Sequence, residues 1–176
     1  MNTHRHVLSV LVENRPGVLT RVASMFARRN YNIHSLAVGP TEDERVSRLT
    51  VVVGAEAVQL EQIIKQLNKL VHVLKIIELD TEATVQREMQ LVKVTTTPQT
   101  RSQVIDVVEV FRANVIDVDH DSLIVEAAGS PEKLEALLNM LLPYGVREIV
   151  RSGTIALSRG NRSITDGSKL RMRSVV

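Results

Sequence analysis

The residues whose types and spacing could bind a small molecule lie in the stretch Asn14-Arg15-Pro16-Gly17-Val18-Leu19. An apolar, strand-like run over Val7–Val12 ends just before this stretch, and a helical spacing of apolar residues begins within it. The first N–H groups of a helix lack partners and lie at the positive end of its dipole, so a carboxylate is a suitable ligand there. Gly17 has no Cβ, which lets a ligand approach the backbone closely.

Asn14 adds a second binding group, because its side chain carries an amide donor and a carbonyl acceptor that suits an ammonium group. Val18 and Leu19 offer a small apolar wall beside it. Together these groups predict a site for a free amino acid with a modest aliphatic side chain. A second candidate, Asn32, lies where the first helix leads into the second strand. In the alternative interpretation, Asn14 only caps the helix and Gly17 only forms the turn.

The sequence contains none of the common phosphate-binding or catalytic motifs GxxxxGK(S/T), GxGxxG, GxSxG and HExxH. His4 and His6 could share one face of a strand, but two histidines near a terminus are better explained as solvated side chains than as metal ligands. The run Asp119-His120-Asp121 is typical of a turn, and Glu42-Asp43-Glu44 is predicted to be a solvated loop tip. We therefore expect no catalytic and no metal-binding residues, although residues distant in sequence can meet in space.

The composition favours a globular protein of a reducing compartment. Hydrophobic residues make up 44% of the 176 positions but aromatic residues only 2%, so the core is built from Val, Leu, Ile and Ala. The absence of cysteine excludes disulfides and thiolate chemistry. The N-terminus lacks the apolar region of a signal peptide, and no run approaches the roughly 18 apolar residues of a membrane span. We expect a cytoplasmic protein with no membrane partner.

The formal net charge of +2 is partly local to the C-terminal end. The segment after Leu157 carries Arg159, Arg162, Lys169, Arg171 and Arg173 against the single acidic residue Asp166. A basic tail can contact nucleic acid or an acidic protein surface, but a solvated end is the simpler interpretation. We expect residues 161–176 to form a basic, flexible tail.

Four stretches repeat apolar residues at helical spacing and predict amphipathic helices, each with one face for a sheet. Their apolar positions are Val18, Val22, Met25 and Phe26; Leu60, Ile63, Ile64 and Leu67; Val104, Val107, Val108 and Phe111; and Leu134, Leu137, Leu138, Leu141 and Leu142. Segments rich in Val, Ile and Thr between them predict eight strands. These strands cover Val7–Val12, Ile33–Val38, Arg48–Val53, Val73–Leu79, Met89–Thr95, Val115–Asp119, Leu123–Ala128 and Arg147–Arg151. Ser130 is expected to cap the last helix, with Pro131 in its first turn.

The order βαββαβ thus occurs twice, which predicts an α+β fold with two consecutive ferredoxin-like units. We expect an N-terminal domain over residues 1–80 and a C-terminal domain over residues 81–160, joined by the polar segment 80–88. In such a unit both helices cover one face of the sheet. The other face must then be covered by another unit or by a partner chain, which predicts pairing between the units, between subunits, or both.

Five motifs carry a resemblance to a known family, in order over about residues 7–160. They are LSVLVENRPGVLTRV, NIHSLAVGPTEDERVSRLTVVV, QLNKLVHVLKIIEL, REMQLVKV and RSGTIALSRG. The first half resembles an ACT domain, a βαββαβ module that senses amino acids. The whole chain resembles the regulatory small subunits of acetohydroxyacid synthase, also called acetolactate synthase.

The resemblance implies a non-catalytic partner of a thiamine-diphosphate-dependent enzyme that makes acetolactate and acetohydroxybutyrate for valine, leucine and isoleucine synthesis. Such a subunit activates the catalytic subunit and confers feedback inhibition, usually by valine. Thiamine diphosphate, Mg and FAD are expected on the catalytic partner, and no cofactor on this chain.

The resemblance also implies a homodimer, because ACT domains of the family pair across a two-fold axis with their sheets side by side and the effector at the interface. Carried over by motif, the effector-binding residues of one chain are Asn14, Gly17, Val18 and Leu19. Asn32 and Ile33 of the partner subunit complete the site.

Two features depart from the family pattern. His34 follows Asn32-Ile33 where an acidic residue is expected, and residues 161–176 extend past the usual end. An amino-acid sensor acting on transcription is an alternative, since tandem ACT-like domains and basic tails occur in such proteins. The helices have sheet-packing faces, and aromatic residues are few, so no nucleic-acid partner is expected. An enzyme is a third class, disfavoured by the absent motifs. The identity of the branched-chain effector stays open.

Overall fold

The computed structural model describes residues 4–166, which form two compact units. The first unit contains the described residues up to Val85 and again from Ile155 onward, and the second contains Gln86–Thr154. The chain therefore leaves the first unit, builds the second, and returns to the first. The expected boundary after residue 80 falls after Val85, and residues 155–160, expected in the second domain, belong to the first unit.

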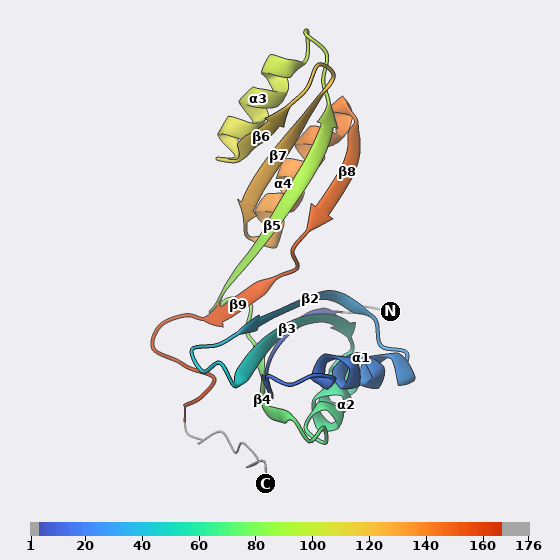
Figure 1. The fold of residues 1–176 in the computed structure, drawn as a ribbon, viewed down its shortest axis with the longest axis vertical. Coiled ribbons are helices and arrows are strands. Elements are labelled where there is room, and N and C mark those ends of the chain that lie inside the picture. Colours follow the sequence, from blue (N-terminus) through green and yellow to red (C-terminus); the bar gives the residue numbers. More distant parts are fainter. Residues whose placement is uncertain (1–3, 167–176) are drawn as a thin grey trace. The chain divides into compact units, whose positions relative to one another are not determined.

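The first unit is a four-stranded antiparallel sheet with two helices on one face (Figure 1). In chain order its elements are β1 (His4–Glu13), α1 (Val18–Arg28), β2 (Ile33–Pro40), β3 (Val46–Ala55), α2 (Ala57–Leu67) and β4 (Val73–Leu79). The strands lie in the order β2-β3-β1-β4, so β2 and β4 are the edges. This is the βαββαβ order predicted from the sequence.

The core of this unit lies between the sheet and the helices, because successive side chains of a strand point to opposite faces of the sheet. Alternate residues of β1 pack against the inward-facing side chains of the helices. Leu8, Val10 and Val12 lie in one buried cluster with Val22 and Phe26 of α1, at the spacing that makes α1 amphipathic. The same cluster includes Ile63 and Leu67 of α2.

The other face of this sheet, here called the outer face, is covered by the returning C-terminal segment. Ala156 of β9 (Ile155–Ser158) packs with Val7, Val52 and Leu79. Ile164, which is buried, packs with Leu11 and Val46. Residues 155–164 thus pack on this face of the first unit, although residues 155–160 were expected to belong to the second domain. The expected pairing between subunits stays a prediction.

The second unit repeats the same element order. Its elements are β5 (Thr84–Thr95), whose first two residues belong to the first unit, α3 (Arg101–Val110), β6 (Asn114–Val118), β7 (Ser122–Gly129), α4 (Pro131–Leu141), a 3-10 turn (Leu142–Tyr144) and β8 (Val146–Arg151). The strands lie in the order β6-β7-β5-β8. The hydroxyl of Ser130 accepts a hydrogen bond from Lys133 N at 3.4 Å, which confirms the predicted cap.

All four predicted helices and all eight predicted strands are present, and the α+β class with two βαββαβ units is confirmed. Two features differ from the prediction. β9 was not predicted, and β5 begins within the expected polar linker. Of the expected tail, residues 161–166 follow β9, and Ile164 is buried; residues 167–176 lie outside the described residues.

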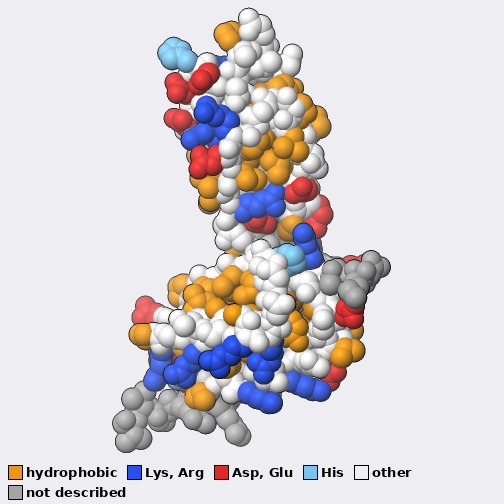
Figure 2. Space-filling model, turned by 90° about the vertical axis from the view of Figure 1, so that its right-hand side faces the viewer, with side chains coloured by type: hydrophobic (Ala, Val, Ile, Leu, Met, Phe, Trp, Pro, Cys, Tyr) orange, Lys and Arg blue, Asp and Glu red, His pale blue; other side chains and the backbone are white. Residues whose placement is uncertain are grey.

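Hydrophobic side chains also remain on the surface of both units (Figure 2). In the first unit the exposed residues include Leu19 on α1 and Val38 on the edge strand β2. Over residues 4–166, no helix is long and apolar enough to cross a membrane.

Candidate functional site

The turn formed by Asn14-Arg15-Pro16-Gly17, here called the 14–17 turn, joins the end of β1 to the start of α1. Gly17 is the N-cap residue of α1 and has a left-handed conformation with φ 81° and ψ −7°. Glycine suits this position because other residues are strained at positive φ. A Cβ built on Gly17 would meet no atom within 4 Å, so open space lies beside the backbone here.

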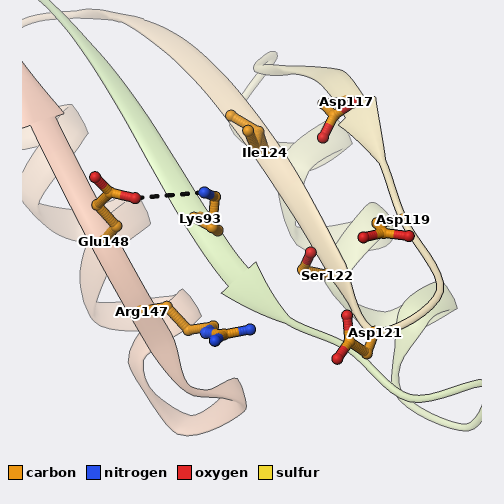
Figure 3. Close-up of a pocket in the computed structure, with 8 residues that line it drawn as sticks. All are labelled: Lys93, Asp117, Asp119, Asp121, Ser122, Ile124, Arg147 and Glu148. Atoms are coloured by element: carbon orange, nitrogen blue, oxygen red, sulfur yellow. Dashed lines mark hydrogen bonds and ion pairs between the residues drawn. The ribbon is translucent and has the colours of Figure 1, made fainter.

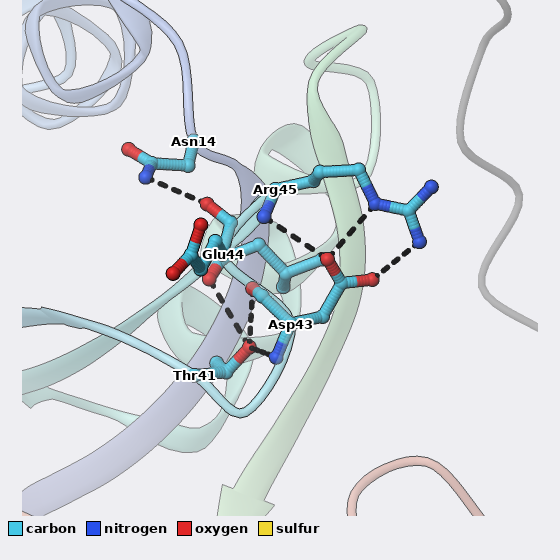
Figure 4. A network of polar contacts seen from close by, with 6 residues as sticks. Asn14, Thr41, Asp43, Glu44 and Arg45 are labelled. Carbon is cyan, nitrogen blue, oxygen red and sulfur yellow. Dashed lines mark hydrogen bonds and ion pairs between the residues drawn. The ribbon is translucent and has the colours of Figure 1, made fainter.

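Asn14 does not cap the helix, because its side chain binds a different part of the first unit. Its Nδ2 donates to the carbonyl oxygen of Glu44 at 2.9 Å, and its backbone N–H donates to the carbonyl oxygen of Arg45 at 2.7 Å (Figure 4). Figure 4 shows the side-chain oxygen of Asn14 pointing away from Glu44. The helix-cap interpretation is therefore wrong, and this oxygen remains available to accept a hydrogen bond.

The loop that receives Asn14, residues 41–45, is ordered by its own polar contacts (Figure 4). Oδ1 of Asp43 accepts from Arg45 Nε at 2.9 Å and from Arg45 N at 3.0 Å, and Oδ2 accepts from Nη2 at 2.7 Å. These hydrogen bonds from the side chain and backbone of Arg45 lower the pKa of Asp43 from 3.8 to about 2. The hydroxyl of Thr41 lies within hydrogen-bonding distance of the carbonyl oxygens of Asp43 and Val46 and donates to them. Sequence reasoning assigned this segment only to a solvated tip and missed its role in holding Asn14.

A buried carboxylate, that of Glu13, lies directly before the turn. Glu13 is 4% exposed, and its Oε2 lies 3.1 Å from Arg15 Nε and 2.9 Å from His72 Nδ1. Its backbone N–H donates to the carbonyl oxygen of His72, and its carbonyl oxygen accepts from Arg15 N. The start of the 14–17 turn is thus tied to two neighbouring segments of the first unit, at Glu44–Arg45 and at His72.

The structure separates the two residues expected to form an apolar wall. Leu19 is 44% exposed on α1 and is free to contact a ligand. Val18 is 5% exposed and belongs to the core cluster beneath the helix, so its side chain does not face the open space beside Gly17. Of the two apolar residues expected to contact the ligand from this chain, Leu19 is accessible and Val18 is not.

Asn32 and Ile33 lie at the opposite end of the sheet from the 14–17 turn. Ile33 pairs with Val53, which pairs with His6 near the start of β1. Asn14 follows the end of the same strand, about 25 Å away at the usual rise of a β-strand. One chain therefore does not bring its own Asn14 and Asn32 together.

The second unit contains a pocket that no sequence pattern predicted (Figure 3). Its volume is about 450 Å³, and charged side chains dominate its lining. The lining residues are Lys93, Asp117, Asp119, Asp121, Ser122, Ile124, Arg147 and Glu148. Lys93 Nζ and Glu148 Oε2 form an ion pair at 3.4 Å. Within residues 4–166, no group of three His, Asp or Glu side chains is placed to hold a metal ion.

Comparison with known families matches both units. Residues 8–75 match the family described as "AHAS small subunit-like ACT domain", and residues 87–160 match "Small subunit of acetolactate synthase". The first match includes the 14–17 turn, Asn32 and Ile33, and the second includes β9.

Individual relatives match over most of the chain. The acetolactate synthase small subunit of Mycolicibacterium smegmatis is 56% identical over 92% of this chain and 95% of its own length. That of Bacillus subtilis is 43% identical over 94% of this chain and 96% of its own length. The crystal structure of the acetolactate synthase small subunit from Thermotoga maritima superposes with a TM-score of 0.82 at 41% identity, covering 90% of this chain and 99% of that chain.

Proposed function

The chain belongs to the family of acetolactate synthase small subunits, and on this premise we propose that it activates a catalytic acetolactate synthase subunit and confers feedback inhibition by valine. The observation that supports this most directly is the 14–17 turn, in which an available Asn14 oxygen and the left-handed Gly17 flank the start of α1. The turn lies inside the matched ACT domain.

The 14–17 turn suits the two charged ends of a free amino acid. The ammonium group donates to the side-chain oxygen of Asn14, whose orientation is fixed because Nδ2 is bound to Glu44. The carboxylate lies at the positive end of the α1 dipole, where the missing Cβ of Gly17 leaves room. The ligand's aliphatic side chain contacts Leu19.

A second copy of the chain completes the site in this proposal. β2 is an edge strand, and Val38 on it is 49% exposed. Antiparallel pairing of β2 with β2 of a second copy sets the start of one strand beside the end of the other. Asn32 and Ile33 of the partner subunit then reach the end of the sheet that carries Asn14. The protein is accordingly a homodimer through its first units.

Valine fits the small apolar contact that Leu19 provides, and leucine and isoleucine are the competing effectors. They differ from valine by a methylene, which is worth about 1–3 kcal/mol in an apolar pocket. The chain itself has a regulatory and not a catalytic role. Thiamine diphosphate, Mg and FAD belong to the catalytic partner, and the complex is cytoplasmic.

Reconstitution tests this function. The purified chain is mixed with the catalytic subunit of the same organism, and acetolactate formation is measured with and without valine, leucine and isoleucine. We expect the chain to raise the activity and valine to lower it again. Unchanged activity on addition of the chain, or activation that none of the three amino acids reverses, would contradict the proposal.

A further inference from the structure

We propose that Glu13 is a positioning residue whose buried carboxylate fixes the 14–17 turn in its ligand-binding conformation. The inference rests on the proposed function for the identity of the ligand, valine, but its structural part concerns the turn alone. Glu13 is the last residue of β1 and precedes Asn14 directly, so it controls the point at which the strand leads into the turn.

One oxygen atom of the Glu13 carboxylate, Oε2, makes two contacts. Oε2 lies 3.1 Å from Arg15 Nε and 2.9 Å from His72 Nδ1. An ionised carboxylate only accepts, so in the proposal Nδ1 of His72 is the donor in this contact. Arg15 belongs to the turn, whereas His72 precedes β4, so the carboxylate ties the turn to the neighbouring edge of the sheet.

Burial of the Glu13 carboxylate strengthens its contact with Arg15. The side chain of Glu13 is 4% exposed, whereas that of Arg15 is 43% exposed. A carboxylate removed from water requires partners, so the position of Arg15 is dictated by Glu13. A hydrogen bond from an exposed Arg to an exposed Glu would hold the turn much less firmly.

This contact bears on ligand binding because Arg15 lies between the two binding elements of the turn. Asn14 and Gly17 flank the Arg15-Pro16 pair, and Arg15 N donates to Glu13 O at 3.0 Å. A turn that is already held in its bound conformation loses less freedom when a ligand binds, which raises affinity. Release of Arg15 therefore weakens binding even where the strand itself stays intact.

The first unit also contains a matched control. His6 Nδ1 and Glu78 Oε1 form a second His–Glu pair at 2.7 Å, joining β1 to β4 near the start of β1 and far from the turn. Glu78→Gln removes the same kind of charge from the same pair of strands. Glu78 is 45% exposed and Glu13 is 4% exposed, so Glu78→Gln controls for loss of a His–Glu pair, and the local exchange measurement below separates an effect on the turn from a general loss of stability.

The first measurement is valine affinity of the full-length chain by titration calorimetry. We expect Glu13→Gln and Arg15→Gln each to weaken binding by about tenfold, the range of one charge-assisted hydrogen bond. The double variant should be within about twofold of Glu13→Gln alone, since Glu13→Gln already removes the contact with Arg15. Arg15→Lys should recover part of the loss, and Glu78→Gln should bind as the wild type does.

The second measurement, amide hydrogen exchange of the turn without ligand, is independent of valine. Glu13→Gln should speed exchange over residues 14–18, whereas Glu78→Gln should leave that segment unchanged. Unaltered exchange in Glu13→Gln, or Glu13 and Arg15 effects on affinity that multiply, would overturn the positioning role. A wild-type chain that binds no valine would overturn the proposed function, and the exchange result would still decide the role of Glu13.

Discussion

Asn14 and Asn32, the two amide residues of the candidate site, lie at opposite ends of the four-stranded sheet of the first unit. The pairing of Ile33 with Val53, and of Val53 with His6, sets Asn32 near the beginning of β1, whereas Asn14 follows its end. A site that needs both residues must therefore take one from each of two chains. The proposed site therefore requires two chains and is not complete in a monomer.

Substitution of Gly17 tests the carboxylate end of the site. Gly17→Asp sets a negative charge where the ligand's carboxylate would lie, so it should abolish valine inhibition and leave activation intact. Gly17→Asn has nearly the same shape without the charge, and asparagine tolerates positive φ better than most residues. Both changes should lower the free energy of unfolding by about 1 kcal/mol, because φ is 81°.

Valine titrations of the reconstituted activity, paired with denaturant unfolding, check this expectation. Gly17→Asn is predicted to retain part of the valine response that Gly17→Asp loses. If both variants lose stability but keep normal valine inhibition, the 14–17 turn has only a structural role.

The C-terminal segment offers a test of the outer face. Ile164→Ala removes a buried side chain from the cluster with Leu11 and Val46, so it should lower the free energy of unfolding by about 2 kcal/mol or more. Ile155→Ala is the matched control: this isoleucine is 60% exposed, so its loss should change stability by less than about 0.5 kcal/mol. Chemical denaturation of both variants measures the difference. Equal effects would mean that residues 155–164 do not cover the outer face in solution.

This segment also changes how a truncated chain should be designed. A chain that ends at the linker lacks Ala156 and Ile164 and exposes Val7, Leu11 and Val52. If such a fragment associated, the cause would be its uncovered apolar outer face, so the result would say nothing about the native dimer. The second unit is better removed internally, with residues 155–166 retained.

The alternation and periodicity of the sequence predicted the elements well but not the contacts between distant segments. Helical spacing placed Val18 with Val22 on the core face of α1, and the structure confirms this; the additional role of Val18 as a ligand wall conflicted with that spacing. The four residues of β9 are too few for a period-2 pattern to be read. Nothing local distinguishes exposed Ile155 from buried Ile164, because the difference depends on a sheet formed by residues 4–79.

The polar part of the site shows the same limit. Asn14 and Gly17 stood out from the sequence by their types and spacing, but the partners that hold Asn14 and the preceding Glu13 did not. Glu44 and Arg45 lie 30 residues or more along the chain from Asn14, and His72 is 59 residues from Glu13. Hydrogen bonds over such separations follow from strand register, which a single sequence does not specify.

Acid titration tests the 41–45 loop. The pKa of Asp43 is about 2 in the folded protein and about 3.8 when unfolded, so the ionised carboxylate stabilises the fold above about pH 4. That stabilisation is lost as the pH falls from about 4 through 2. The unfolding free energies of wild type and Asp43→Asn should therefore converge over this range. A difference that stays constant from pH 5 to pH 2 would contradict the assigned pairing with Arg45.

Mixed dimers test the central claim, a two-chain valine site, most directly. Asn14→Ala and Asn32→Ala should each weaken valine binding by about 1–3 kcal/mol. A heterodimer of the two variants holds one site with both asparagines and one with neither. Valine titrations of the separate variants and of their co-refolded mixture, each reconstituted with the catalytic subunit, give the answer. We predict that the mixture regains high-affinity valine inhibition in a fraction of the complexes; no recovery, with heterodimers shown to form, would contradict a site shared between two chains.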